Sequence, residues 1–421
     1  MSAVRAGAVA GILLLSTGCG DALGPDPELA PDVIESLPRD LSAPELAVIG
    51  ASNAFSMDLL RGVEARDDAG NVFLSGLSAS MALGMTMNGA AGQTWDSMRV
   101  ALRFEELTEE QIDASYRDLI ALLLDLDPRV EIGIANATFA DDGFPVAQGF
   151  LDRIRTYFGA EARTLDFDDP ASVDVVNAWA AEKTHDRIRE ILRSWPPGAV
   201  LALLNALYFK GDWTERFDAS ETAPRPFTLP SGEVAERDAM WSREALLRVG
   251  LDTRTGATVG EIPYGGRAFV MDIVMPAEGT PLEELLEGLD DDAWDRWMRA
   301  LPRDFQKGVA QVPKLDLDYE RVLNDELIDL GMGVAFGAGP VPPDFSRMGP
   351  GNLAISLVKQ KTYVRVDEEG TEAAAVTIVV METTSAPSVP TLVVDRPYLF
   401  AIRERLSGTV LFLGTVRDPQ G

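Results

Sequence analysis

The chain has 421 residues, of which 46% are hydrophobic, and its formal net charge is −30. A chain of this length and apolar content can bury the core of one large domain, which excludes a wholly disordered protein. The negative field repels phosphate groups, so we expect neither nucleic acid nor a heparin-like polyanion as a partner.

One cysteine and one histidine restrict the chemistry further. Cys19 lies near the N-terminus, and His185 lies in a polar stretch typical of a helix end. A Ser/His/Asp triad or a Cys/His pair would have to use these two residues, and a structural zinc site usually needs four such ligands. We therefore expect no catalytic residues, no metal and no cofactor. The alternative of an envelope hydrolase depends on His185 alone.

Residues 1–19 have the features of an export signal. A positive charge at Arg5 precedes an apolar stretch from Ala6 to Leu15, which is too short to span a bilayer permanently. The position of Cys19 resembles the lipobox of bacterial lipoproteins, in which the cysteine is acylated. The resemblance implies a cell-envelope lipoprotein, periplasmic or on the cell surface, that meets the membrane only through its lipid anchor. Cleavage by a general signal peptidase, with release to the extracellular space, is the alternative.

An acidic, proline-containing linker over 20–45 precedes one folded domain over 46–421. A helix is predicted where Val48, Ala51 and Phe55 begin an apolar repeat at intervals of three and four residues.

Further elements follow in chain order. Helices are predicted over 75–85, 108–126 and 173–192, and strands over 71–74, 130–139, 201–209 and within 226–275. The nearly continuous apolar run at 201–209 favours a central strand buried on both faces. Helices come early and strands late, which indicates a mixed α+β domain with large sheets.

The segment 371–382 alternates in a way that suits a strand. If it is extended, one face is uncharged and carries Thr371, Ala373, Ala375, Thr377, Val379 and Met381. The segment contains no proline until Pro387, so it could pair within a sheet. A permanently paired strand is the simpler alternative. The tract 385–390 directly after it contains prolines and small residues, which suits a protease-accessible loop.

This region resembles the hinge of the reactive-centre loop in the serpin family of serine-protease inhibitors. The matching hinge residues are Glu369, Gly370, Thr371, Glu372, Ala373, Ala374 and Ala375. Further motifs follow the family's order from about residue 46 to the C-terminus. Two examples are Asn71-Val72-Phe73-Leu74-Ser75 and Asp395-Arg396-Pro397-Tyr398-Leu399-Phe400. The resemblance implies a serpin fold, with about eight to nine helices around three β-sheets and an exposed reactive-centre loop at about 368–392.

The resemblance also assigns residues to two regions of the main sheet. Trp213 belongs to the breach, where loop insertion begins, and the shutter beneath it contains Ser75, Ser78, Asn205 and Gln360. This chain departs from the family's pattern at Gly76, Gln360, Val376 and Tyr398, where proline, histidine, alanine and phenylalanine are usual.

The implied function is inhibition of serine-type, and by extension cysteine-type, endopeptidases by a monomeric suicide substrate. The protease would cleave the loop and be trapped as a covalent acyl-enzyme when the loop inserts. The family's spacing places the scissile bond at Thr384-Ser385, with Met381-Glu382 as the alternative. A threonine suits a shallow elastase-like or subtilisin-like pocket. A non-inhibitory serpin acting as an envelope binding or chaperone protein is the competing interpretation.

Overall fold

The computed structural model describes residues 33–66, 70–371 and 389–420. Nine α-helices and three β-sheets form within these ranges, which confirms the predicted α+β class. The predictions that lie outside the described residues concern Cys19, Glu372, Ala373, Ala374, Ala375, Met381, Glu382, Thr384 and Ser385.

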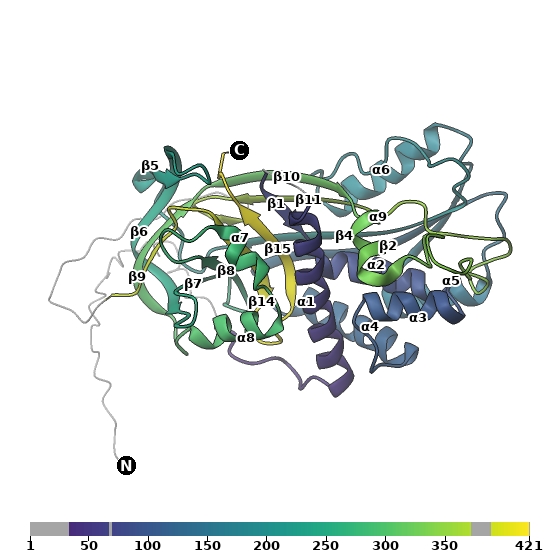
Figure 1. The fold of residues 1–421 in the computed structure, drawn as a ribbon, viewed down its shortest axis with the longest axis horizontal. Coiled ribbons are helices and arrows are strands. Elements are labelled where there is room, and N and C mark those ends of the chain that lie inside the picture. The colour runs from purple at the N-terminus through teal and green to yellow at the C-terminus, as the bar shows by residue number, and fades with distance from the viewer. Residues whose placement is uncertain (1–32, 67–69, 372–388, 421) are drawn as a thin grey trace, which may run out of the picture. The chain divides into compact units, whose positions relative to one another are not determined.

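The helices lie mostly in the first half of the described chain (Figure 1). They are α1 (Ala43–Glu64), α2 (Gly76–Met87), α3 (Gly92–Ala101), α4 (Glu109–Asp125), α5 (Gln148–Phe158), α6 (Ala171–Lys183), α7 (Leu282–Glu287), α8 (Asp291–Ala300) and α9 (Asn324–Leu327), with short helical turns η1 (Ala219–Glu221) and η2 (Ile328–Met332). None of these helices is long and apolar enough to cross a membrane.

Helix α1 begins with a capping box. The Ser42 hydroxyl accepts a hydrogen bond from the Glu45 amide, and the Glu45 carboxylate accepts one from the Ser42 amide at 2.8 Å. These two bonds satisfy backbone donors that the first turn would otherwise leave unpaired. Val48 and Phe55 are fully buried, so the apolar repeat marks the core face of the helix.

Helix α6 is shorter than the sequence indicates. The prediction extended it to residue 192, but the helix ends at Lys183. His185 and Asp186 adopt φ angles of 48° and 64°, which are left-handed and incompatible with a continuing right-handed helix. The prediction was wrong there because the apolar residues after His185 face the same core as α6 from an irregular segment.

The strands form one large and two small sheets. The large sheet contains β1 (Val72–Leu74), β5 (Ala223–Thr228), β6 (Val234–Leu251), β7 (Thr258–Pro263), β8 (Phe269–Met275), β9 (Gln306–Pro313), β13 (Thr391–Val393), β14 (Tyr398–Glu404) and β15 (Val410–Val416). One small sheet has the order β12 (Gly370–Thr371), β4 (Leu201–Asp212), β2 (Val130–Asp141), β3 (Glu161–Leu165), and the other pairs β10 (Leu315–Val322) with β11 (Lys359–Val366).

The large sheet lies at the centre of the main hydrophobic core. Every residue of β8, β14 and β15 is buried. Strands with both faces covered are rich in branched and aromatic side chains because each residue packs against a neighbouring layer. Phe73 stacks against Phe400 and Phe412 at centroid distances of 5.4 and 5.0 Å, which joins β1 to β14 and β15.

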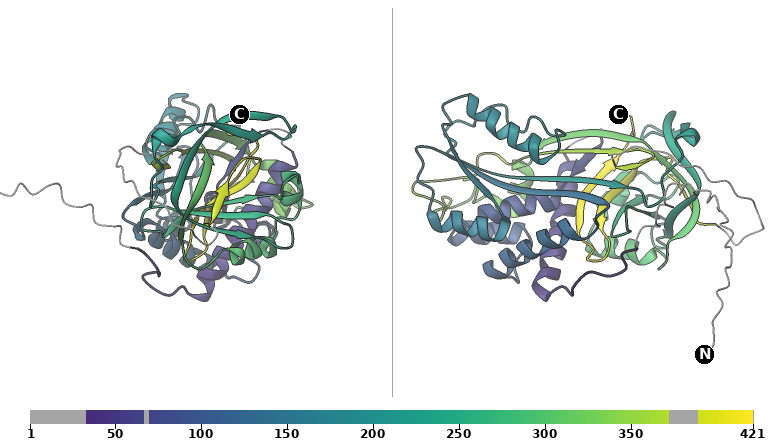
Figure 2. Two further views of the ribbon diagram at one scale, coloured as in Figure 1. Left: turned by 90° about the vertical axis from the view of Figure 1, so that its left-hand side faces the viewer. Right: turned by 180° about the vertical axis from the view of Figure 1, so that it is seen from behind.

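The strands β4 and β2 run between two helices (Figures 1 and 2). Leu204 and Ala206 of β4 belong to the core beneath α6, whereas Leu203 and Leu207 pack into the core shared with α2. Because alternate side chains of a strand point to opposite faces, α2 and α6 cover the two sides of β4. This arrangement fixes which face of any neighbouring strand would point inward.

Candidate functional site

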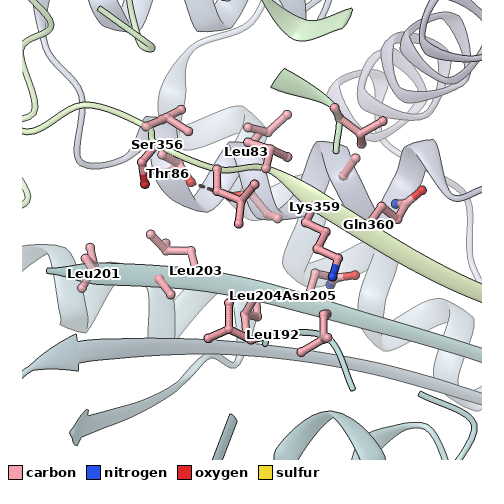
Figure 3. A pocket seen from close by; sticks show the side chains of 18 of the residues that line it. Leu83, Thr86, Leu192, Leu201, Leu203, Leu204, Asn205, Ser356, Lys359 and Gln360 are labelled. Atoms are coloured by element: carbon pink, nitrogen blue, oxygen red, sulfur yellow. Dashed lines mark hydrogen bonds between the residues drawn. The ribbon is translucent and has the colours of Figure 1, made fainter. Parts of the chain in front are cut away.

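A slot separates β4 from β11. Both strands line a cavity of about 260 Å³, together with residues of α2 and α6. No ladder joins the two strands among the residues that the structure describes. Figure 3 shows Leu201, Leu203 and Asn205 on one side of the space and Lys359 and Gln360 on the other. The slot therefore presents two facing strand edges, which could both pair with an added strand.

The opening changes the burial of β4. The strand lies inside the sheet as predicted, but Leu201 to Asn205 are only half-buried, while Ala206 to Phe209 are buried. The expectation that the strand is covered on both faces holds for its second half only. Apolar side chains beside the slot thus retain surface that a further strand could cover.

At the C-terminal end of β4, the slot is already filled by Gly370 and Thr371, which the resemblance assigns to the hinge. Gly370 pairs with Asp212 and Thr371 with Gly211 in an antiparallel ladder between β12 and β4. A Cβ atom at position 370 would lie 2.2 Å from the carbonyl oxygen of Gly211, so only glycine allows this approach. Thr371 is buried, and its hydroxyl lies 3.0 Å from that of Tyr264.

Trp213 anchors the turn that leads into the hinge. Its indole nitrogen donates to the carbonyl of Asp367 at 2.9 Å, and its backbone amide donates to the carbonyl of Glu369 at 2.8 Å. Its ring stacks on Tyr264 at a centroid distance of 4.4 Å. Trp213 therefore holds the start of β12 against the end of β4.

Two hydrogen bonds join Ser75 to Gln360, both of which the resemblance assigns to the shutter. The side-chain oxygen of Gln360 accepts from the Ser75 amide at 2.9 Å, and its nitrogen donates to the Ser75 carbonyl at 2.7 Å. The Ser75 hydroxyl donates to the carbonyl of Leu411 at 2.7 Å and accepts from the Ser78 amide at 3.1 Å, which caps α2. These contacts join β11, α2 and β15.

Asn205 lines the same cavity but is not bonded to Gln360. Its amide nitrogen donates to the side-chain oxygen of Asn136 at 2.8 Å and lies 3.9 Å from the sulfur of Met81. The structure thus brings Ser75, Ser78, Asn205 and Gln360 together around the cavity between β4 and β11. Trp213 directly follows the C-terminal end of β4.

A family model described as Serpin (serine protease inhibitor) matches residues 50–419. The chain belongs to the serpin family. It is 32% identical over 380 residues to Serpin B6 of Macaca fascicularis, covering 88% of this chain and 98% of the relative. It is 31% identical to Leukocyte elastase inhibitor of Bos taurus with the same coverages. The solved structure of the thermophilic serpin Tengpin in its native state matches with a TM-score of 0.80 at 27% identity, over 93% of this chain and 97% of that one.

Two departures from the serpin pattern have a structural explanation or consequence. A Cβ atom at Gly76 would lie 1.9 Å from the hydroxyl oxygen of Ser56, so α1 and α2 approach too closely for a proline there. The Tyr398 side chain is fully buried, and its hydroxyl has no hydrogen-bond partner among the residues that the structure describes. Burial raises the pKa of Tyr398 well above its ordinary value, so the serpin keeps this hydroxyl neutral.

The sequence motifs did not reveal an ion pair beside the hinge. Lys314 follows β9 and contacts both carboxylate oxygens of Glu368, at 2.9 and 2.8 Å. Burial opposes ionisation of Glu368, but hydrogen bonds, chiefly from Lys314, outweigh it and lower the pKa of Glu368. Tyr264, which stacks on Trp213, likewise had no role assigned from the sequence. No local pattern joins residues so far apart in the chain.

His185 lies at the surface of the serpin domain, as expected. Its side chain is 56% exposed, its Nε2 lies 3.0 Å from a carboxylate oxygen of Glu131, and its ring packs against that of Tyr208. Neither of these described partners is the serine or cysteine that a Ser/His/Asp triad or a Cys/His pair needs.

Proposed function

We propose that this serpin inhibits serine-type endopeptidases as a single-use suicide substrate. The observation that supports the proposal is the slot between β4 and β11. Gly370 and Thr371 of the hinge are already paired with the last two residues of β4, at one end of this slot. A strand that begins in the correct place needs only a free end to continue into the slot, and cleavage of the loop would supply that end.

The chemistry belongs to the protease. Its serine oxygen attacks the carbonyl carbon of Thr384, the bond to the nitrogen of Ser385 breaks, and the proton delivered to that nitrogen gives a free amine. The Thr384 carbonyl remains as an ester on the protease. Insertion of the preceding residues would then carry the attached protease away from its attacking position before water hydrolyses the ester.

Insertion is favourable because it completes a sheet. Continuing the β12 and β4 register pairs residues 372–381 with residues 210–201, since each step forward in the loop is one step back in β4. About ten new backbone hydrogen bonds at a net ~0.5 to 1.5 kcal/mol each are comparable with the stability of a whole domain. Val379 and Met381 would face Leu203 and Leu201, which are half-buried.

The proposed targets have elastase-like or subtilisin-like pockets. Thr384 is small and β-branched, and no basic residue occurs between Gly370 and Asp395 to suit a trypsin-like pocket. The name of the related bovine Leukocyte elastase inhibitor is consistent with this class of target. Cleavage after Met381 is the alternative, and it would favour a deeper apolar pocket.

The decisive experiment is incubation of the full chain with an elastase-like protease, followed by denaturing electrophoresis and mass spectrometry. We expect a covalent complex that survives boiling in detergent and a released fragment beginning at Ser385. Trypsin is the matched control and should form no complex. Complete cleavage without any complex would contradict the inhibitory proposal. It would favour a binding function, as in the solved thyroxine-binding globulin complex with thyroxine, which matches at a TM-score of 0.77 and 26% identity.

We also propose that the protein is an exported lipoprotein anchored through Cys19. The support is the signal-like segment 1–19 in the sequence. Mass spectrometry of the mature N-terminus should find an acylated cysteine, and Cys19→Ser should release the protein from membranes. A mature N-terminus at any other residue would contradict this anchor.

A further inference from the structure

Residues 33–41 lie against the folded domain, although the sequence predicts a linker over 20–45. We call this segment the strap. The amide of Ile34 donates to the carbonyl of Gly266 at 2.8 Å, and the carbonyl of Ile34 accepts from a guanidinium nitrogen of Arg405 at 2.9 Å. Three aliphatic side chains of the strap pack against the main core, namely Ile34, Leu37 and Leu41. Ordering a chain segment costs conformational entropy, which these contacts must offset.

The other end of the strap is fixed to helices α1 and α4. The guanidinium of Arg39 contacts both carboxylate oxygens of Glu45, at 3.0 and 2.5 Å, and lies 3.4 Å from the carbonyl oxygen of Asp118. Glu45 also completes the capping box of α1. A bidentate pair of arginine and carboxylate has a fixed geometry, so the strap is held at both of its ends.

The turn over 264–267 receives the strap and joins β7 to β8. Gly265 and Arg267 have φ angles of 46° and 75°, in the left-handed region. An arginine is uncommon there, and such a conformation persists where neighbouring groups hold it in place. Arg405 supplies one of these contacts, because its Nε donates to the carbonyl of Arg267 at 2.8 Å. The guanidinium of Arg405 therefore joins the strap to the left-handed arginine of the turn.

The same turn holds the C-terminal end of β4. The amide of Gly265 donates to the carbonyl of Asp212, the last residue of β4, at 2.8 Å. The carbonyl of Gly265 accepts from the hydroxyl of Thr214 at 2.9 Å. These two bonds fix the turn to the residues on either side of Trp213.

Tyr264 connects this turn to the first residues of the hinge. Its ring stacks on that of Trp213 at a centroid distance of 4.4 Å, and its hydroxyl lies 3.0 Å from that of Thr371. Tyr264, Trp213 and Thr371 are all buried. Tyr264 is separated by one residue from Gly266, whose carbonyl holds the strap. A short path of packed and hydrogen-bonded groups therefore leads from the strap to the hinge.

We propose that Ile34 and Arg405 are positioning residues for the hinge. They hold the turn over 264–267, and through Tyr264 the turn holds Thr371 at the end of β4. The importance of this role rests on the proposed inhibition, because it concerns the residues at which insertion would begin. The contacts themselves belong to the uncut chain.

Hydrogen exchange of the full, uncut chain tests the proposal. The reporter is the amide of Trp213, which donates to the carbonyl of Glu369. Ile34→Pro removes the donor to Gly266, since proline has no amide hydrogen, whereas Ile34→Ala keeps it. We expect Ile34→Pro to speed exchange at Trp213 by about two- to tenfold, as for the loss of one hydrogen bond, and Ile34→Ala to have a smaller effect.

A second variant and two controls make the result specific. Arg405→Ala should also speed exchange at Trp213, because it removes the donors to the strap and to the turn. Ser36→Pro should not, since the amide of exposed Ser36 makes no hydrogen bond among the described residues. In Ile34→Pro, the amide of Leu413 in the central strand β15 should exchange at its original rate. Unchanged exchange at Trp213 in both strap variants, or equal acceleration at Leu413, would overturn the proposal.

The reaction with an elastase-like protease gives an independent readout. We expect Ile34→Pro to give a smaller fraction of covalent complex than Ser36→Pro, because a loosened hinge would begin insertion later. If the original chain forms the complex but Ile34→Pro leaves exchange at Trp213 unchanged, the positioning role is wrong and the proposed function stands. If exchange at Trp213 is faster but the original chain forms no complex, the proposed function fails and the positioning role stands.

Discussion

The ammonium group of Lys314 lies within 2.9 Å of both carboxylate oxygens of Glu368, across a separation of 54 residues. The carbonyl of Glu368 also accepts a hydrogen bond from the amide of Phe217 at 2.9 Å. This pair fixes the turn between β11 and β12, and hence the point from which a loop strand would enter the slot.

We predict that Lys314→Met destabilises the intact protein by about 1 to 3 kcal/mol, because it leaves a largely buried carboxylate without its cation. Equilibrium unfolding of the uncut chain measures the effect. Lys307→Met is the matched control, since Lys307 pairs with Glu215 where both side chains are nearly half exposed. That pair should contribute less than about 1 kcal/mol. Equal effects of the two substitutions would show that Lys314 has no special role.

Thr371→Arg should turn the inhibitor into a substrate. Thr371 is buried beside Tyr264, and an arginine there would have to place an unpaired charge in the core before the loop could insert. Electrophoresis of the protease reaction should show cleaved chain in place of covalent complex. Thr371→Ser keeps the hydroxyl and should preserve the complex. Normal trapping by the arginine variant would mean that insertion does not depend on the burial of residue 371.

Gly76→Ala should cost about 1 to 3 kcal/mol, because its Cβ would overlap the side chain of Ser56. Thermal and denaturant unfolding measure the loss, and Ser56→Gly in the same chain should restore part of it. Gly149→Ala in α5 is the control, since nothing lies within 4 Å of the added Cβ. It should be neutral or slightly stabilising. If Gly76→Ala leaves the stability unchanged, the close approach of α1 and α2 is contradicted.

Asp113 should make stability depend on pH. Burial raises the pKa of its carboxyl to about 6, although Asn88 and Arg153 both donate hydrogen bonds to it. The folded protein therefore holds this proton more tightly than the unfolded chain does. The resulting contribution to stability is complete below about pH 4 and is lost as the pH rises through about 6.

Comparison with Asp113→Asn measures this contribution. Relative to the variant, the original chain should be more stable at pH 4.5 than at pH 7.5, by an amount on the order of 1 to 3 kcal/mol. Asp152→Asn, at a side chain that is 63% exposed, controls for the loss of one negative charge. If the difference in stability between the original chain and Asp113→Asn stays constant with pH, the raised pKa of Asp113 is contradicted.

Local periodicity allowed much of the fold to be predicted. The apolar repeat that begins at Val48 predicted α1, and the nearly continuous apolar run of β4 predicted a strand within a sheet. The resemblance predicts a hinge that begins at Glu369, and two of its described residues, Gly370 and Thr371, pair with β4. These features are predictable because helix and strand periods act over a few neighbouring residues.

The end of α6 and the environment of β4 depended on tertiary structure. Residues after His185 are apolar enough to continue a helix, and only their packing beneath the sheet shows that they do not. The half-buried state of Leu203 likewise follows from the absence of a paired strand between β4 and β11 among the described residues.

The sequence by itself determined the order of the serpin motifs, and it predicts a hinge that can form a strand. Only the tertiary structure decided that Lys314 meets Glu368, that Gln360 is bound to Ser75, and that the amide of Asn205 donates to Asn136. Side-chain periodicity specifies which face a residue occupies, but hydrogen bonds and ion pairs between distant segments depend on how the sheets and helices pack.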